Sequence, residues 1–96
     1  SVYIPKSPHG AGSEVRPHQE STFAYTEPAS VAVLWLALED ACIENACMYG
    51  IIGSNHWPLK WVSRVNHQRK TREFEQLNEV HIPDFVTEHD YYTPLE

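Results

Sequence analysis

The fold of this chain is decided by the stretch VAVLWLALEDACIENACMYGII, residues 31–52. Its first eight residues, 31–38, are the longest near-continuous apolar run in the sequence. The run matches a helical stripe with Ser30 as the N-cap, and it matches a buried strand almost as well, because both faces of such a strand are apolar. The helical stripe would consist of Val31, Leu34, Trp35, Leu38 and Cys42. Periodicity alone leaves both alternatives open.

The residues that follow this run predict a turn and then a strand. Glu44, Asn45 and Ala46 are typical of a turn, and residues 47–52 are typical of a second strand. If residues 31–38 form a strand, the whole stretch becomes an antiparallel hairpin.

The flanks of the stretch predict short extended pieces and turns. Pro and Gly punctuate the first thirty residues, where we expect short strands at 2–4 and 22–26. The polar segment 67–79 predicts either a helix or a long surface loop. Residues 82–83 and 91–94 contain Pro and are typical of extended or edge segments.

Length and charge limit the classes of partner. The chain has 96 residues and a net charge of −6, which fits one small domain or a piece of one. The excess of acidic over basic residues disfavours nucleic acid and anionic membranes as partners, because like charges repel. The longest apolar run is too short to span a bilayer, and no signal peptide is visible.

The two cysteines, Cys42 and Cys47, predict free thiols in a reducing compartment, and hence a cytoplasmic location. A zinc site formed by Cys42, Cys47 and His56 is an alternative, although the spacing is not C-x2-C and a fourth ligand is hard to nominate.

The candidate chemistry lies in Pro17-His18-Gln19-Glu20. On an extended chain, residues i and i+2 point to the same side, so His18 and Glu20 present an imidazole and a carboxylate to one metal ion. A distant second His would complete a facial triad of the kind that holds Fe(II). The alternative is a solvated surface pair.

Three segments of the chain resemble the phytanoyl-CoA dioxygenase family, and within it the domain-containing branch. They are YIPKSP at 3–8, GSEVRPHQESTFAYTEP at 12–28 and LWLALEDACIENAC at 34–47. The resemblance covers roughly the first 56 residues in near-continuous order. It implies a mainly β fold, a partial double-stranded β-helix (jelly roll) of antiparallel strands with long loops. Residues 1–96 would then be the N-terminal half of one catalytic domain, with 31–39 as a strand.

The resemblance also implies Fe(II) and 2-oxoglutarate as cofactors and the hydroxylation of a small or lipid-like molecule. It implies His18 as the first iron ligand, and it places Glu20 where the family has Asp. Trp35 would line the 2-oxoglutarate pocket, and Thr26 would lie near the co-substrate. The alternatives are a core aromatic residue for Trp35 and an ordinary strand residue for Thr26.

The chain departs from the family pattern in four respects. Glu20 replaces Asp, Ala46 stands where the family hairpin has Gly, and the I-P-G-S-H motif is altered by Ile52 and an inserted Asn55. The family's second iron-binding His and its 2-oxoglutarate Arg lie beyond this segment. The remaining candidate imidazoles are interpreted as surface groups; they are His67, His81 and His89.

These departures predict an incomplete and inactive segment of an oxygenase. The alternative is a non-catalytic relative that keeps the fold as a binding module. Open strand edges of such a segment also predict self-association.

Overall fold

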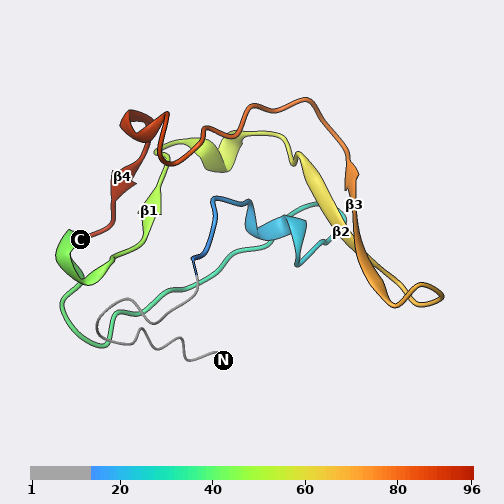
Figure 1. The fold of residues 1–96 in the computed structure, drawn as a ribbon, viewed down its shortest axis with the longest axis horizontal. Coiled ribbons are helices and arrows are strands. Elements are labelled where there is room, and N and C mark those ends of the chain that lie inside the picture. The colour runs from blue at the N-terminus through green and yellow to red at the C-terminus, as the bar shows by residue number, and fades with distance from the viewer. Residues whose placement is uncertain (1–13) are drawn as a thin grey trace.

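The computed structural model describes residues 14–96. It contains two small antiparallel sheets joined by long irregular segments (Figure 1). The strands are β1 Tyr49–Gly50, β2 Trp61–Asn66, β3 Thr71–Gln76 and β4 Thr93–Pro94. The short 3-10 helices are η2 Glu20–Thr22, η3 Ile43–Asn45, η4 Ser54–His56 and η5 His89–Tyr91. The prediction of a mainly β chain with antiparallel strands and long loops is confirmed at this level.

The larger sheet is the hairpin of β2 and β3, in register from Trp61 opposite Gln76 to Asn66 opposite Thr71. The Asn66 side chain stabilises the connecting loop, because its Oδ1 accepts hydrogen bonds from the backbone N–H groups of Gln68 and Arg69. Both predictions for 67–79, a helix or a long surface loop, are therefore wrong.

The smaller sheet pairs β1 with β4, Tyr49 opposite Pro94 and Gly50 opposite Thr93. The backbone N–H of Leu95 extends this pairing by donating to the carbonyl of Met48 over 2.8 Å. The prediction of an extended segment at 91–94 is confirmed for β4. Pro94 is tolerated because this strand has only one neighbour.

The stretch 31–52 does not form the expected hairpin. Residues 31–38 carry neither helix nor strand, and β1 pairs with β4 instead of with this run. The run therefore pairs with no strand among residues 14–96. The turn at 44–46 is confirmed as η3, and Ala46 closes it in the left-handed region at φ 61° and ψ 53°.

The predicted strand at 22–26 is also wrong. The chain turns at η2, where the backbone N–H groups of Thr22 and Phe23 bond back to the carbonyls of Gln19 and Glu20. Thr22 is buried there at 5% exposure, and η2 lies against β2. The predicted strand at 2–4 lies outside the described residues.

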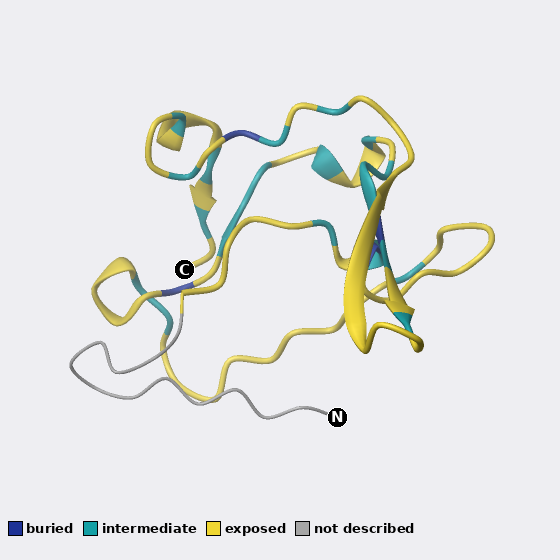
Figure 2. Cartoon of the chain, turned by 45° about the vertical axis from the view of Figure 1, so that its right-hand side comes forward, coloured by how far each residue is buried: buried dark blue, intermediate teal, exposed yellow. Residues whose placement is uncertain are grey.

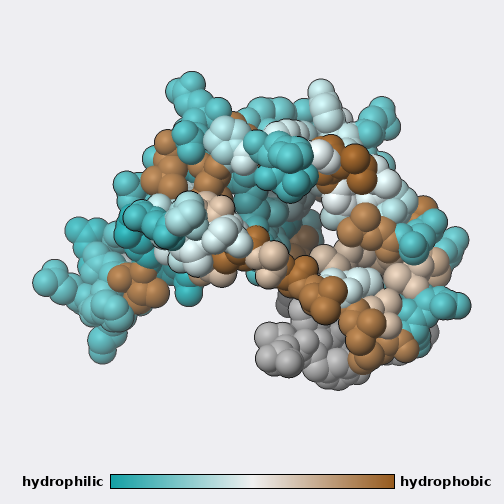
Figure 3. Space-filling model, turned by 180° about the vertical axis from the view of Figure 1, so that it is seen from behind, coloured by the Kyte–Doolittle hydropathy of each residue, from teal (hydrophilic) through white to brown (hydrophobic). Residues whose placement is uncertain are grey.

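The buried core is small. Among the described residues, only Thr22, Cys47, Val62 and Pro83 are buried, and most of the chain is exposed (Figure 2). Large hydrophobic side chains lie on the surface (Figure 3). Both cysteines are free thiols. No helix in residues 14–96 is long and apolar enough to cross a membrane.

Candidate metal centre

His18 and Glu20 come together as their spacing predicts. The Nε2 atom of His18 lies 3.4 Å from Oε2 of Glu20, and both side chains are partly exposed, at 38% and 55%. Two donors bound to one octahedral metal ion at about 2.1 Å each lie roughly 3 Å apart. The pair therefore fits two neighbouring positions of one metal ion, and the extra methylene of Glu20 does not keep its carboxylate away from the imidazole.

The protonation of His18 follows from its second hydrogen bond. Nδ1 lies 2.8 Å from the carbonyl oxygen of Arg16. A carbonyl can only accept, so Nδ1 carries the hydrogen, and in the neutral ring Nε2 presents a lone pair toward the carboxylate. A metal ion between Nε2 and the carboxylate would accept both lone pairs. A backbone carbonyl on the other ring nitrogen is also the usual support of a metal-binding histidine.

An aromatic ring holds the imidazole from the side. The Phe23 ring meets His18 edge to face with centroids 5.5 Å apart, and Phe74 meets Phe23 in the same way at 6.1 Å. The guanidinium of Arg72 lies over the Phe23 ring at 6.0 Å. Because Arg72 and Phe74 are two apart on β3, the hairpin supports the imidazole through Phe23.

Gln19, between the two candidate ligands, makes the longest-range contacts of this segment. Its Nε2 donates to the carbonyl of Pro58 over 2.9 Å, and its Oε1 accepts from the backbone N–H of Lys60 over 2.9 Å. The sequence did not predict four residues as parts of the site: Gln19, Phe23, Arg72 and Phe74. No local pattern marks them, because their partners lie far away along the chain or on a strand that was not predicted.

The structure places the two predicted co-substrate residues in the irregular segment after η2. The Oγ1 atom of Thr26 donates to the carbonyl of Pro28 and accepts from the N–H of Ser30, so it holds a local turn. Trp35 is half exposed at 49%. No hydrogen bond or ion pair in residues 14–96 joins either residue to His18 or Glu20.

The other histidines and the cysteines do not add ligands. No group of three His, Cys, Asp or Glu side chains in the described part of the chain could hold a metal ion. The zinc alternative at Cys42, Cys47 and His56 is therefore wrong. His81 instead pairs with Glu88, with Nε2 and Oε2 2.7 Å apart, and His89 contacts the carbonyl of Phe85 through Nδ1.

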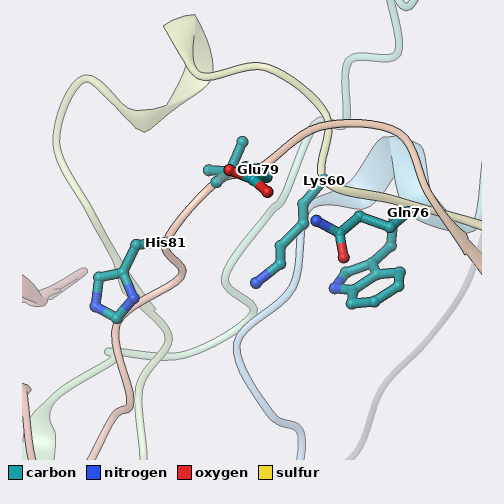
Figure 4. A pocket seen from close by; sticks show the side chains of 6 residues that line it. Lys60, Gln76, Glu79 and His81 are labelled. Atoms are coloured by element: carbon teal, nitrogen blue, oxygen red, sulfur yellow. The ribbon is translucent and has the colours of Figure 1, made fainter.

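A shallow hollow of about 350 Å³ opens where the hairpin begins and ends (Figure 4). Its lining consists of Lys60, Trp61, Gln76, Glu79, Val80 and His81. The Nζ atom of Lys60 lies 5.7 Å from the centre of the Trp61 ring, which is cation–π distance. The backbone N–H of Lys60 also donates to the side chain of Gln19. This hollow therefore lies next to the point where Gln19 attaches the His18–Glu20 segment to the hairpin.

Comparison with known proteins identifies the family. The phytanoyl-CoA dioxygenase (PhyH) family matches residues 1–91. Phytanoyl-CoA dioxygenase 1 of Oryza sativa is 55% identical over 60 residues, 62% of this chain and 21% of the relative. Phytanoyl-CoA dioxygenase domain-containing protein 1 of Mus musculus is 55% identical over 56 residues, 57% of this chain and 19% of the relative.

A third relative, phytanoyl-CoA dioxygenase of Arabidopsis thaliana, is 51% identical over 55 residues, 57% of this chain and 19% of the relative. The chain thus spans about a fifth of the length of the curated relatives that it matches. No solved structure matches it. The family match covers most of the sequence and includes the candidate ligands, and on this basis the chain belongs to the phytanoyl-CoA dioxygenase family.

Proposed function

We propose that the chain is part of a non-haem Fe(II)/2-oxoglutarate-dependent dioxygenase that hydroxylates a small or lipid-like molecule. Family membership supports the reaction class. The observation that carries the proposal is the His18–Glu20 pair, in which Nε2 and a carboxylate oxygen lie 3.4 Å apart. Mixed imidazole and carboxylate donors suit Fe(II), which non-haem oxygenases hold with two His and one carboxylate.

The chain's own residues would divide the work as follows. His18 and Glu20 supply two ligands, and the Arg16 carbonyl keeps the hydrogen of His18 on Nδ1 so that Nε2 stays free to bind. Trp35 and Thr26 are the proposed contacts of 2-oxoglutarate. When bound together, Fe(II) and 2-oxoglutarate supply the activation of O2 for insertion of one oxygen atom into a C–H bond.

For the whole protein we propose a jelly-roll domain in which residues 1–96 are one portion. The exposed apolar run 31–38 supports this proposal, because a strand buried on both faces within a larger domain is a continuous apolar run. We place the protein in the cytoplasm, on the ground that Cys42 and Cys47 are free thiols.

Manganese binding by the 96-residue chain tests the metal centre, since Mn(II) substitutes for Fe(II) without reacting with oxygen. Electron paramagnetic resonance titration is expected to show weak 1:1 binding, because residues 14–96 supply two ligands. His18→Ala and Glu20→Ala should each weaken it at least tenfold. His67→Ala, in the hairpin loop, is the matched control and should change nothing. Absence of binding, or a complex that survives His18→Ala, overturns the proposal.

We propose further that the isolated chain does not couple 2-oxoglutarate decarboxylation to hydroxylation. Two ligands are supplied by residues 14–96, and a missing positioned catalytic group commonly costs about 10²–10⁴-fold in rate. Succinate measured after incubation with Fe(II), 2-oxoglutarate and O2 should stay at the level of the His18→Ala variant. Succinate formation that depends on His18 would contradict this expectation.

A second candidate function is a non-catalytic binding module with a degraded ligand set. Ala46 favours it, because an alanine held at φ 61° occupies a position where the resemblance has Gly. Glu20 also favours the binding module, because it stands where the resemblance has Asp. In the complete protein, Glu20→Asp should raise oxygenase activity if the first function holds. If the complete protein is inactive and stays inactive after Glu20→Asp, the result favours the binding module.

A further inference from the structure

We propose that Gln19 is the positioning residue of the metal pair: its side-chain amide fixes the His18–Glu20 segment to the backbone at Pro58 and Lys60. The proposal rests on the proposed function, because it assigns a role at the same site. It begins with exposure, which alternates along the segment: His18 and Glu20 are exposed, and Gln19 between them is half buried. The ligands therefore point to one side of the chain and the amide points to the other.

The amide uses both of its ends on one short piece of backbone. Nε2 donates to the carbonyl of Pro58, and Oε1 accepts from the N–H of Lys60, each over 2.9 Å. A primary amide is the only side-chain group that donates and accepts in this fixed arrangement without a charge. Gln19 thus acts as a two-point clamp, which fixes an orientation as well as a distance.

The backbone that receives the clamp is itself held from its other side. The N–H of Leu77 donates to the carbonyl of Lys60 over 2.7 Å, and Nδ2 of Asn78 donates to the carbonyl of Leu59 over 2.7 Å. Residues 58–60 also lead directly into β2. Gln19 therefore ties the ligand segment to a hairpin that is braced on both strands.

Without the clamp, the ligand segment loses its side-chain hydrogen bonds to the hairpin and keeps three other restraints. These are the η2 turn, the Arg16 carbonyl on Nδ1 of His18, and the Phe23 ring. The Phe23 ring also contacts Phe74 and Arg72 on β3, so part of the attachment to the hairpin remains. The hydrogen bond from Nδ1 of His18 to the Arg16 carbonyl depends on the backbone shape of residues 16–20, which the clamp helps to fix. Losing the clamp is expected to loosen the segment, to open this hydrogen bond part of the time and to spread the separation of Nε2 and Oε2.

Gln19→Met tests this, because methionine has nearly the length of glutamine and makes neither hydrogen bond. Asn78→Leu is the matched control, since it removes a side-chain hydrogen bond to the same backbone piece without touching the ligand segment. Gln19→Glu is a second variant: its carboxylate can accept from Lys60 but cannot donate to Pro58, so it should show an intermediate effect. Unchanged amide shifts in β2 and β3 verify that each variant keeps the hairpin.

Two readouts are taken on the 96-residue chain. In the metal-free protein, nitrogen-15 shifts of the His18 ring report the fraction of the Nδ1–H tautomer. In the titration with Mn(II) alone, the dissociation constant reports how tightly the His18–Glu20 pair binds the metal ion. Gln19→Met should lower the tautomer fraction toward an even mixture and weaken Mn(II) binding about tenfold, while Asn78→Leu should leave both within about twofold.

Equal effects of Gln19→Met and Asn78→Leu, or no effect of Gln19→Met on either readout, overturn the inference. If the unsubstituted chain binds no Mn(II), the proposed function fails. The metal-free His18 spectra still decide the role of Gln19 in that case, so the two failures are distinguishable.

Discussion

Ala46 adopts a left-handed backbone conformation that L-residues other than Asn and Asp rarely occupy. It ends η3, just before the N–H of Cys47 bonds to the carbonyl of Cys42 over 3.0 Å. Glycine has no Cβ penalty there but loses more entropy on folding, so Ala46→Gly should stabilise the turn by about 0.5–1 kcal/mol. Hydrogen exchange of the Cys47 amide should slow about twofold to fivefold.

Gly53 is the natural control for this prediction, because it also lies in the left-handed region, at φ 82°. A Cβ added there meets nothing within 4 Å, so Gly53→Ala changes the backbone term alone. It should destabilise η4 by a similar amount. If Ala46→Gly speeds exchange of the Cys47 amide, the assignment of strain to Ala46 is wrong.

Asp84 and Glu88 make the loop before η5 sensitive to acid. Hydrogen bonds from the backbone N–H groups of Thr87 and Val86 lower the pKa of Asp84 below its ordinary 3.8. The hydrogen bond from His81, with one from the N–H of Asp84, lowers the pKa of Glu88 below its ordinary 4.5. Both pKa values are lower in the folded state, so the unfolded chain binds more protons as the pH falls.

The contribution of these carboxylates to stability is therefore fully present above pH 4.5 and is lost as the pH falls through the lower folded pKa values. The amide proton shifts of Val86 and Thr87 should titrate with a midpoint below 3.8. Asp84→Asn keeps an acceptor and should abolish this titration. A midpoint at or above 3.8 would count against the hydrogen-bonded loop.

At the level of elements, β2 carries the one fully buried apolar side chain in the described part of the chain, Val62 at 2% exposure. Val62→Ala removes two methyl groups and leaves a cavity, so it should cost about 2 kcal/mol of stability. The control is Val65→Ala in the same strand, where the side chain is 52% exposed, and it should cost less than about half as much. Urea unfolding followed by tryptophan fluorescence measures both, and equal costs would mean that Val62 is not the core of the hairpin.

Elements with local signals were predictable, and elements that depend on a partner were not. Asn45 signals its turn because its side chain accepts from the N–H of Cys42 and donates to the carbonyl of Asp40, all within five residues. In contrast, β3 is exposed at every position and has one large apolar side chain, Phe74, so it shows no period of its own. Its strand conformation is set by pairing with β2.

The candidate site divides in the same way. The meeting of His18 and Glu20 follows from a spacing of two residues, which the sequence displays. The Gln19 bonds cross 39 and 41 residues, a separation at which no sequence pattern specifies a partner. The roles of Trp35 and Thr26 rest on the family resemblance and stay predictions.

For the whole molecule, the exposed apolar run 31–38 dominates the expected behaviour in solution. Leu34 is 97% exposed and Leu36 is 76% exposed. An uncovered apolar segment with free backbone groups invites association with a second copy. Sedimentation velocity should show dimers or larger species that Leu34→Lys disperses. Val86→Lys is the control, because Val86 is 81% exposed but lies in the separate 84–88 loop. A monomeric chain, or an equal effect of Val86→Lys, would contradict this expectation.

The two sheets are nested around the loop 67–70: β2 pairs with β3, and outside them β1 pairs with β4. Every strand pairing in residues 14–96 thus joins a residue before this loop to one after it, as do the bonds from Leu77 to Lys60 and from Asn78 to Leu59. The peptide backbone can therefore be interrupted in the loop without severing either sheet. Synthetic peptides 1–69 and 70–96 should reassemble on mixing and reproduce the β2–β3 amide shifts of the intact chain, whereas a break inside β2 should prevent reassembly.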